Sequence, residues 1–344
     1  MSPRPAPTPS QPPTRPSERT VTDLAPYPSP EERERELDGL VARLEGAGHT
    51  ASIHNYGESV AGRPLRAVRV ASKRNEAAAR TEPAKVLVCA NTHGPEFIGN
   101  RVAHGLLEAL IAGQPQVAAL HERAELWVAP CLNPDGYART HARGGQGQLR
   151  DLRPNERGVD LNRNWPLPPG SRRLPIPGAG SSRSGDATYR GPEPLSEPET
   201  AALDALMHEQ GFWACVNLHS FMGTLFPARV EDPASFRVYR ELCESFTDRQ
   251  TVHRYRRVAS RRFDTYTGEQ EDHQHHNHRC WSVCVESFPL RASFRQHLRA
   301  PSLFWRFNPR DPEPWVRNEV PAVATFLGRA AERSRPEVRT LRTT

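Results

Sequence analysis

Short apolar runs alternate with longer amphipathic stretches through most of this sequence, and that alternation is what most constrains its fold. The apolar runs begin at Pro64, Lys85, Glu125, Trp213 and Trp281. Strands with near-continuous apolar sequence are buried on both faces of a sheet. The stretches between them have the length and apolar spacing of helices, and the clearest are residues 96–113, 196–210, 232–246 and 314–334. We therefore expect a single α/β domain, with a mixed, mostly parallel and twisted sheet that has helices on both faces.

The two ends of the chain differ in composition from its middle. Residues 1–28 alternate proline with small polar residues, and such a segment cannot bury enough apolar surface to offset the entropy of ordering. Ser29, which precedes Pro30 and two glutamates, has the features of a helix N-cap. We predict a disordered proline-rich tail over residues 1–28, a folded domain over residues 29–334 and a C-terminal tail over residues 335–344.

The charge pattern argues against one class of function. The chain has 46 basic and 40 acidic residues, a formal net charge of +6, and nearly all the basic residues are arginine. A nucleic-acid surface needs basic residues concentrated on one element, but here they are spread along the chain. The densest basic cluster, residues 253–263, is interpreted as a solvated edge, with an anion-binding cleft as the alternative. We therefore expect no nucleic-acid partner.

The cysteines and the apolar runs indicate which cellular compartment to expect for this chain. None of the 6 cysteines forms a CxxC pair, and several lie in apolar runs where a thiol behaves as a small hydrophobic group. The N-terminal segment lacks the apolar region of a secretory signal, and no run approaches the length of a membrane span. We expect a cytoplasmic protein with reduced thiols and no membrane partner.

Potential metal ligands follow two of the apolar runs in the same way. His93 and Glu96 come soon after the run that begins at Lys85, and His219 ends the run that begins at Trp213. Ligands bind at the carboxyl ends of strands in open α/β sheets, so these side chains can converge. An HxxE pair alone is a weak signal, but a second histidine at a strand end strengthens it. A catalytic zinc takes three such ligands and keeps a position for water, so we predict one zinc ion per chain, bound by His93, Glu96 and His219.

A fourth residue, Glu286, lies within the apolar run VCVESF. A carboxylate in this position is costly to bury unless it is paired or close to a metal. We therefore place Glu286 beside the predicted zinc as an uncoordinated catalytic carboxylate, and this arrangement makes the chain a candidate hydrolase.

A histidine-rich segment, DHQHHNH at residues 272–278, is a second candidate for metal binding. We expect it in a polar loop, where no strand or helix fixes the geometry of the ligands. The dispersed set is therefore the predicted metal site. The HExxH pattern of helix-borne zinc proteases is absent from the sequence.

Given these residues, the chain resembles the zinc carboxypeptidase family, the metallocarboxypeptidases that include pancreatic carboxypeptidases A and B. The resemblance rests on segments that follow the family's order between Tyr56 and Phe288: YGESVAGRPL, NTHGPEFIGN, LNPDGY, GVDLNRNWP, YRGPEPLSEPET, NLHS and VCVES. It implies the zinc carboxypeptidase fold for residues 29–334.

The resemblance implies a role for each matching residue of the metal centre. His93, Glu96 and His219 match the zinc ligands, and Glu286 matches the general base that takes a proton from the attacking water. Asp160 matches the carboxylate that orients the first histidine, and such a partner fixes the tautomer of the ring.

Further matches imply how a substrate would be held. Asn162 and Arg163 match the pair that grips the free carboxylate of a C-terminal residue, a task suited to a guanidinium fork. An arginine that polarises the scissile carbonyl is expected upstream, and both Arg150 and Arg153 are candidates. Tyr266 matches the tyrosine that closes over the substrate.

Three other positions bear on specificity. Glu271 falls near the position at the base of the specificity pocket, and an acid there favours a basic terminal side chain. Pro95 and Phe221 stand where the pancreatic enzymes have an arginine and a tyrosine. The subsites beyond the scissile bond are therefore expected to differ.

The resemblance implies a zinc-dependent carboxypeptidase whose partner is a peptide or peptide-like substrate with a free carboxylate. Two related activities stay open: a bacterial murein-peptide carboxypeptidase or amidase, and an N-acyl amino acid deacylase on the same scaffold. A non-catalytic zinc- or peptide-binding module is a third alternative, but the presence of Glu286 beside the three ligands favours an enzyme.

Overall fold

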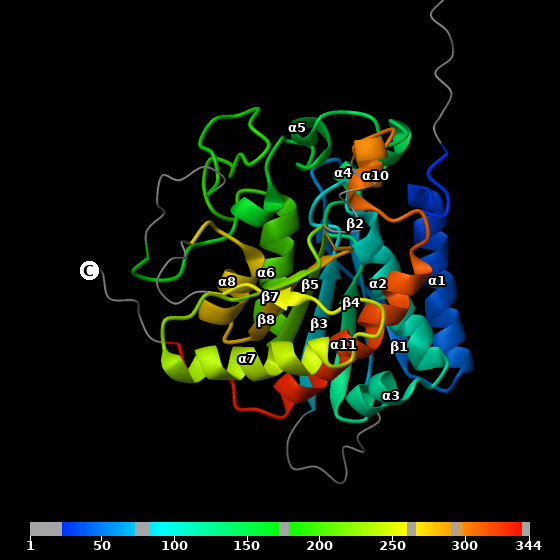
Figure 1. The fold of residues 1–344 in the computed structure, drawn as a ribbon, viewed down its shortest axis with the longest axis vertical. Coiled ribbons are helices and arrows are strands. Elements are labelled where there is room, and N and C mark those ends of the chain that lie inside the picture. The colour runs from blue at the N-terminus through cyan, green and yellow to red at the C-terminus, as the bar shows by residue number, and fades with distance from the viewer. Residues whose placement is uncertain are drawn as a thin grey trace, which may run out of the picture.

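The computed structural model describes residues 23–72, 83–171, 179–259, 266–289, 295 and 298–338. An eight-stranded mixed sheet runs through its centre (Figure 1). The strand order is β1 (Ala51–Glu58), β2 (Pro64–Val70), β4 (Ala124–Ala129), β3 (Ala84–Ala90), β5 (Ala214–Ser220), β8 (Trp281–Ser287), β6 (Thr224–Pro227) and β7 (Arg256–Arg257). The central strands β4, β3, β5 and β8 are parallel, whereas β1, β2 and β6 join antiparallel. The predicted mixed α/β sheet is confirmed.

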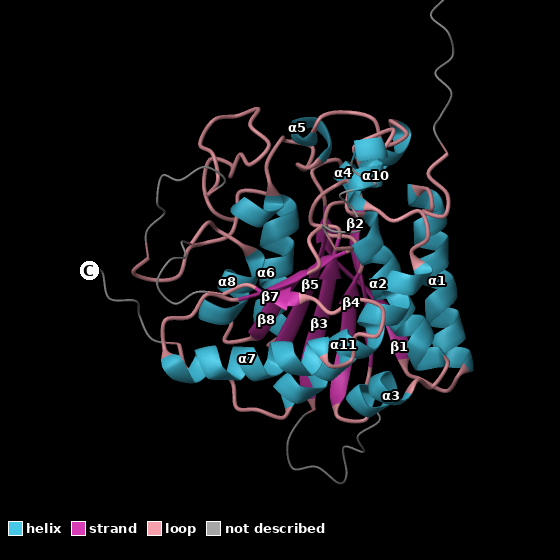
Figure 2. Ribbon diagram, in the orientation of Figure 1, coloured by secondary structure: helices cyan, strands magenta, loops and turns pink. Residues whose placement is uncertain are grey.

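Helices cover both faces of this sheet, as predicted (Figure 2). Their bounds are α1 (Pro30–Gly46), α2 (Phe97–Ile111), α3 (Pro115–His121), α4 (Pro134–Ala142), α5 (Leu149–Leu152), α6 (Pro198–Gln210), α7 (Pro233–Thr247), α8 (Gln270–His276), α10 (Phe304–Phe307) and α11 (Glu313–Ala331), with a short 3-10 helix η2 (Leu161–Arg163). Apolar residues of α1, α2, α3, α7 and α11 form one large core with the sheet. On the opposite face, α6 packs against the sheet through Leu203, Leu206 and Met207.

The predicted tails contribute residues to the folded domain. Leu24 and Tyr27 are buried, and the Tyr27 ring makes an edge-to-face contact with Phe304 at 5.3 Å. At the other end, the Arg335 guanidinium lies 4.6 Å from the Trp213 ring. The folded domain therefore extends a few residues beyond the predicted boundaries at residues 29 and 334, because side chains at both ends bury apolar surface on it.

The histidine-rich segment 272–278 differs from its prediction. Most of it lies in helix α8, and the α8 side chains are buried. Each of its histidines has a polar partner from another element, such as the Tyr239 hydroxyl, which lies 2.8 Å from His275 Nδ1. Buried polar groups are tolerated when they are hydrogen-bonded in this way. The polarity of the local sequence cannot predict such partners, because they come from other elements.

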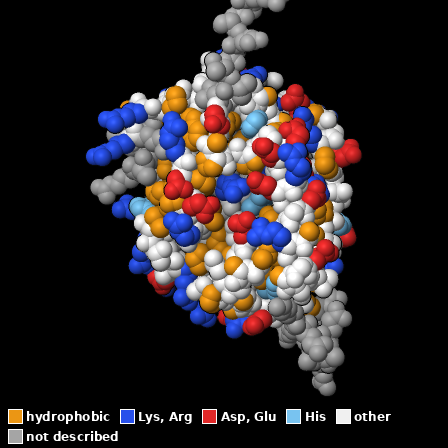
Figure 3. Space-filling model, turned by 90° about the vertical axis from the view of Figure 1, so that its right-hand side faces the viewer, with side chains coloured by type: hydrophobic (Ala, Val, Ile, Leu, Met, Phe, Trp, Pro, Cys, Tyr) orange, Lys and Arg blue, Asp and Glu red, His pale blue; other side chains and the backbone are white. Residues whose placement is uncertain are grey.

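The surface carries intermingled charges on the face shown in Figure 3, where acidic and basic side chains alternate without a patch of one sign. Among the described residues, ion pairs such as Arg66 with Glu34 and Arg101 with Glu36 join acidic and basic side chains. Within the described part of the chain, no helix is long and apolar enough to cross a membrane.

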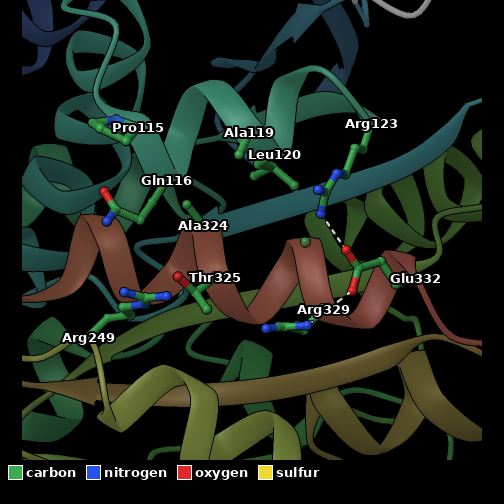
Figure 4. Close-up of a pocket in the computed structure, with 11 residues that line it drawn as sticks. Pro115, Gln116, Ala119, Leu120, Arg123, Arg249, Ala324, Thr325, Arg329 and Glu332 are labelled. Carbon is green, nitrogen blue, oxygen red and sulfur yellow. Dashed lines mark hydrogen bonds and ion pairs between the residues drawn. The ribbon is translucent and has the colours of Figure 1, made fainter.

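A groove lies between α3 and α11, and Figure 4 shows its lining residues. Arg123 and Arg329 both pair with Glu332 there, so these basic groups are already neutralised in part. Among the described residues that line this groove, no nucleophile, base and metal ligand lie together. The groove is therefore not the candidate functional site.

Candidate metal centre at the carboxyl ends of the central strands

The register of β3, β5 and β8 brings the predicted ligands to one place. In the parallel pairing of β5 with β8, His219 lies opposite Glu286. β3 pairs with β5 on the other side, and its chain continues from Ala90 toward His93. Because the strands run in the same direction, their carboxyl ends share one edge of the sheet, and all of these side chains meet there.

The loop between β3 and α2 is shaped by close packing. His93 and Glu96 flank Gly94, whose backbone N–H donates to the Arg153 carbonyl oxygen at 3.1 Å. A Cβ added at Gly94 would lie 2.2 Å from the Leu152 carbonyl oxygen, so no side chain fits at this position. The glycine of HGPE therefore holds the loop against the segment that carries Arg153.

Three buried side chains point their donor atoms at one another. His93 Nδ1 lies 2.8 Å from Glu96 Oε1, and His219 Nδ1 lies 3.0 Å from Glu96 Oε2. The two Nδ1 atoms are 3.2 Å apart. Four-coordinate zinc with bonds of about 2.0–2.1 Å holds neighbouring ligand atoms roughly 3.3 Å apart. The spacing and the imidazole–carboxylate chemistry of this set therefore fit a zinc ion.

The electrostatics of Glu96 and His219 also suit a cation. Burial favours the neutral form of Glu96, but His93 and His219 outweigh it and hold the pKa of this carboxyl well below its usual range. Burial lowers the pKa of His219, so its ring is neutral and its lone pair is available. An ionised carboxylate and a neutral imidazole are the forms that bind metals.

Asp160 connects this set to its surroundings. Its side chain caps η2 by accepting from the Asn162 N–H at 3.0 Å, and its Oδ1 also lies 3.1 Å from His93 Nε2. Its Oδ2 accepts from Arg153 Nε at 2.9 Å. Asp160 therefore contacts both the His93 ring and the Arg153 guanidinium.

The structure separates the two candidate arginines. Arg153 Nη1 lies 3.9 Å from Glu96 Oε1, and the side chain is only 15% exposed. Arg150 is exposed on the short helix α5. Only Arg153 of the pair lies at the centre.

Glu286 lies beside the three ligands without a hydrogen bond at Oε2 to any described residue. Ligand atoms of His219, Cys284 and Glu286 all lie within 4.8 Å of one another. Burial, followed by the charge of Glu96, raises the pKa of Glu286 to about 8. This combination gives a carboxyl group that is poised to exchange a proton near neutral pH.

Asn162 and Arg163 lie on η2, next to the beginning of α8. The Asn162 side-chain oxygen accepts from the Gln270 backbone N–H at 2.9 Å. Arg163 Nη1 lies 3.2 Å from Glu269 Oε1, and its side chain is 13% exposed. This guanidinium is therefore held at the rim of the centre by an ion pair.

Tyr266 lies shortly before α8, and Glu271 lies on that helix. The Tyr266 hydroxyl donates to the Arg229 carbonyl oxygen at 3.4 Å, and its ring lies against His276. Glu271 is buried on α8, and its Oε2 has no hydrogen-bond partner among the described residues. Burial, followed by the charges of Glu269 and Asp272, raises the pKa of Glu271 well above its usual value.

Arg229 and Glu269 were not predicted from the sequence, and their ion pairs link η2 with α8. Arg229 Nη1 lies 2.7 Å from Asp272 Oδ2 and also pairs with Glu269. Neither residue belongs to a recognisable motif, and they are far apart in the sequence. Only the fold brings them to this wall of the site.

Known proteins resemble this chain in sequence. A family model described as zinc carboxypeptidase matches residues 40–293. The metallocarboxypeptidase A-like protein of Trichophyton verrucosum is 30% identical over 211 residues, which cover 58% of this chain and 47% of that protein. Human carboxypeptidase A5 is 36% identical over 118 residues, or 32% of this chain and 26% of that protein. The chain thus spans about half or less of the length of these relatives.

Solved structures share the fold at low sequence identity. Bovine thrombin-activatable fibrinolysis inhibitor, in complex with tick carboxypeptidase inhibitor, gives a TM-score of 0.66 at 21% identity, covering 88% of this chain and 97% of that one. Carboxypeptidase A from Helicoverpa armigera gives a TM-score of 0.65 at 19% identity, covering 89% of this chain and 73% of that one. At these identities the likeness concerns the fold alone.

Proposed function

This chain belongs to the zinc carboxypeptidase family, and from that premise we propose that it hydrolyses the C-terminal peptide bond of a peptide or peptide-like substrate. The observation that carries the proposal is the convergence of His93, Glu96 and His219 beside Glu286. A binding module would need the three ligands, but it would have no use for a half-buried carboxyl group next to them whose Oε2 has no hydrogen bond to any described residue.

In this proposal His93, Glu96 and His219 hold one zinc ion. When bound, zinc supplies Lewis-acid chemistry, since it lowers the pKa of water toward about 7 and polarises a carbonyl group. Asp160 keeps the His93 ring oriented through its 3.1 Å contact with Nε2.

Glu286 acts as the general base in this proposal. Its carboxylate accepts the proton of the attacking water and later donates it to the leaving amine. Burial raises the pKa of this group to about 8, and a neighbouring divalent cation would lower it toward the working pH. A base of matched pKa moves protons most efficiently.

Arg153 and the two η2 residues, Asn162 and Arg163, interact with negatively charged groups of the substrate in this proposal. Arg153, fixed by Asp160, donates to the oxygen on which negative charge develops, and such preorganised donors contribute a large part of catalysis. Asn162 and Arg163 bind the terminal carboxylate, which competes with Glu269 for the Arg163 guanidinium.

The proposed terminal side chain is basic. Glu271 is a buried acid whose Oε2 lacks a hydrogen bond to any described residue, and a lysine or arginine side chain supplies the missing partner. Since its pKa is raised, Glu271 ionises when that cation binds.

The direct test compares peptides that end in a free carboxylate with the same peptides as C-terminal amides, in zinc-loaded protein. The proposal predicts release of the last residue from the free acid and little from the amide. Equal rates on both would contradict an exopeptidase, and cleavage inside the peptide would contradict the role of Asn162 and Arg163.

A further inference from the structure

A second set of metal-binding side chains lies away from the centre described above, between α6 and the end of α8. It consists of Asp204 on α6, His273 on α8 and His278 just after α8. Asp204 Oδ1 lies 2.6 Å from His273 Nε2 and 2.7 Å from His278 Nε2. The two Nε2 atoms are 3.3 Å apart.

The nitrogen-to-nitrogen separation resembles that of the first set, where the two histidine nitrogens are 3.2 Å apart, against 3.3 Å here. The nitrogen-to-oxygen separations are shorter than in the first set. Two imidazoles and one carboxylate are ligands that zinc takes, with water completing the coordination. We propose that Asp204, His273 and His278 form a second metal site, which binds a divalent transition ion of the zinc class and joins α6 to α8.

The exposure of the three side chains suits an ion that enters from solvent. His273 is 2% exposed, His278 11% and Asp204 28%, so the site is walled on one side and open on the other. Water can therefore reach the open side and fill the remaining positions. An ion between the three groups needs nitrogen-to-oxygen distances near roughly 3.3 Å, so the Asp204 carboxylate would move outward when the ion binds.

The other histidines of the segment have different contacts. His275 Nδ1 lies 2.8 Å from the Tyr239 hydroxyl, and His276 Nε2 lies 2.7 Å from the Arg229 carbonyl oxygen. Two of the four histidines therefore contact Asp204. The other two contact Tyr239 and Arg229.

An ion at this site would secure the far end of α8. The N-terminal end of α8 is held by Asn162, which accepts from the Gln270 N–H. The Trp165 ring stacks on His273, with centroids 5.2 Å apart. The same helix carries Glu271. The second ion therefore has a structural role in this proposal, behind the wall of the first site.

Hydrogen bonds from the two histidines to one carboxylate oxygen give similar distances without an ion. Metal analysis of the whole chain separates the two arrangements. After equilibration with zinc and removal of the free metal, the wild type should retain two ions per chain. His278→Gln should retain one, and so should His93→Gln, which disables the other centre.

The matched control is His208→Gln, an exposed histidine one turn after Asp204 on α6, and it should retain two ions. Equal zinc content in the wild type and His278→Gln would overturn the proposal and leave a hydrogen-bonded triad only. The milder Asp204→Asn variant gives the same comparison if His278→Gln folds poorly.

A second readout does not depend on activity. In the His93→Gln background, added zinc should raise the Tm, because a ligand that binds only the folded state stabilises it. The rise should vanish when Asp204→Asn is added, and magnesium or calcium should give none, since these ions prefer oxygen ligands. A zinc-induced rise of the same size in both backgrounds would also overturn the proposal.

Discussion

His219 and Glu286 lie directly opposite each other in the parallel strands β5 and β8. A slip of one residue in this register would turn one of the two side chains to the other face of the sheet. The pairing of the proposed ligand His219 with the proposed base Glu286 is therefore set by the backbone of the two strands, and we expect that each can be replaced without moving the other.

The first prediction follows from that independence. Glu286→Gln removes the proton acceptor but keeps the size of the side chain, so kcat should fall by roughly 10²–10⁴-fold. Zinc content should stay at the wild-type value, as measured by elemental analysis of the same preparation. The exposed Glu209 on α6 is the control, and Glu209→Gln should have wild-type kcat. Near-normal turnover of zinc-loaded Glu286→Gln would remove this residue from the mechanism.

The second prediction concerns the arginine pair. Arg153→Ala should lower kcat by roughly 10²–10³-fold, the cost of losing one donor to a developing oxyanion. Arg150→Ala should leave steady-state kinetics unchanged, because this side chain is exposed on α5. Similar losses in both variants, or a loss in Arg150→Ala alone, would contradict the placement of Arg153 at the centre.

The third prediction concerns Asp160, which holds His93 Nε2 and Arg153 Nε. Asp160→Asn should weaken zinc binding by about 10–100-fold, the usual effect of removing such a partner. Competition with a chelator of known affinity measures this change. The matched variant Asp151→Asn, on the exposed side of α5, should bind zinc as the wild type does.

The fourth prediction tests specificity. Glu271→Gln should lower kcat/KM for peptides that end in lysine or arginine and spare those that end in leucine, because only the former use the buried acid. A uniform loss over all three substrates would indicate a purely structural role for Glu271.

The fifth prediction concerns stability and pH. Glu319 on α11 is buried, accepting from the Tyr255 hydroxyl at 2.5 Å and the Ser287 hydroxyl at 2.7 Å. Burial raises its pKa from 4.5 to about 7. Between these values the folded state holds a proton that the unfolded state lacks, so stability falls as pH rises, by about 3 kcal/mol in total.

Glu319→Gln removes this titration. The difference in unfolding free energy between pH 5 and pH 8 should therefore shrink by about 3 kcal/mol in the variant, as measured by urea denaturation. Glu313→Gln, at the exposed start of α11, should keep the wild-type difference. An unchanged pH dependence in Glu319→Gln would show that this carboxyl is ionised throughout the range.

The central strands could be predicted from the sequence because each is an apolar run buried on both faces, as in β3 and β5. The first strand, β1, was not predicted. It lies at the edge of the sheet, and polar residues such as His54 and Asn55 interrupt its apolar pattern. The two-residue strand β7 is too short to give any local signal.

Within the site, residues that follow a strand end could be found, since the chain direction places His93 and His219 at one edge. The choice between Arg150 and Arg153 could not be made, because it depends on how α5 packs on the HGPE loop. The pairing of Asp204 with His273 was equally invisible, since 69 residues separate them and only the docking of α6 on α8 brings them together.

Anomalous X-ray diffraction at the zinc absorption edge can locate the ion that we propose is bound by His93, Glu96 and His219. In crystals of the zinc-loaded protein, we expect a peak within bonding distance of Nδ1 of both histidines and of the Glu96 carboxylate. A map without a peak between these three side chains, in protein that contains zinc by elemental analysis, would contradict it.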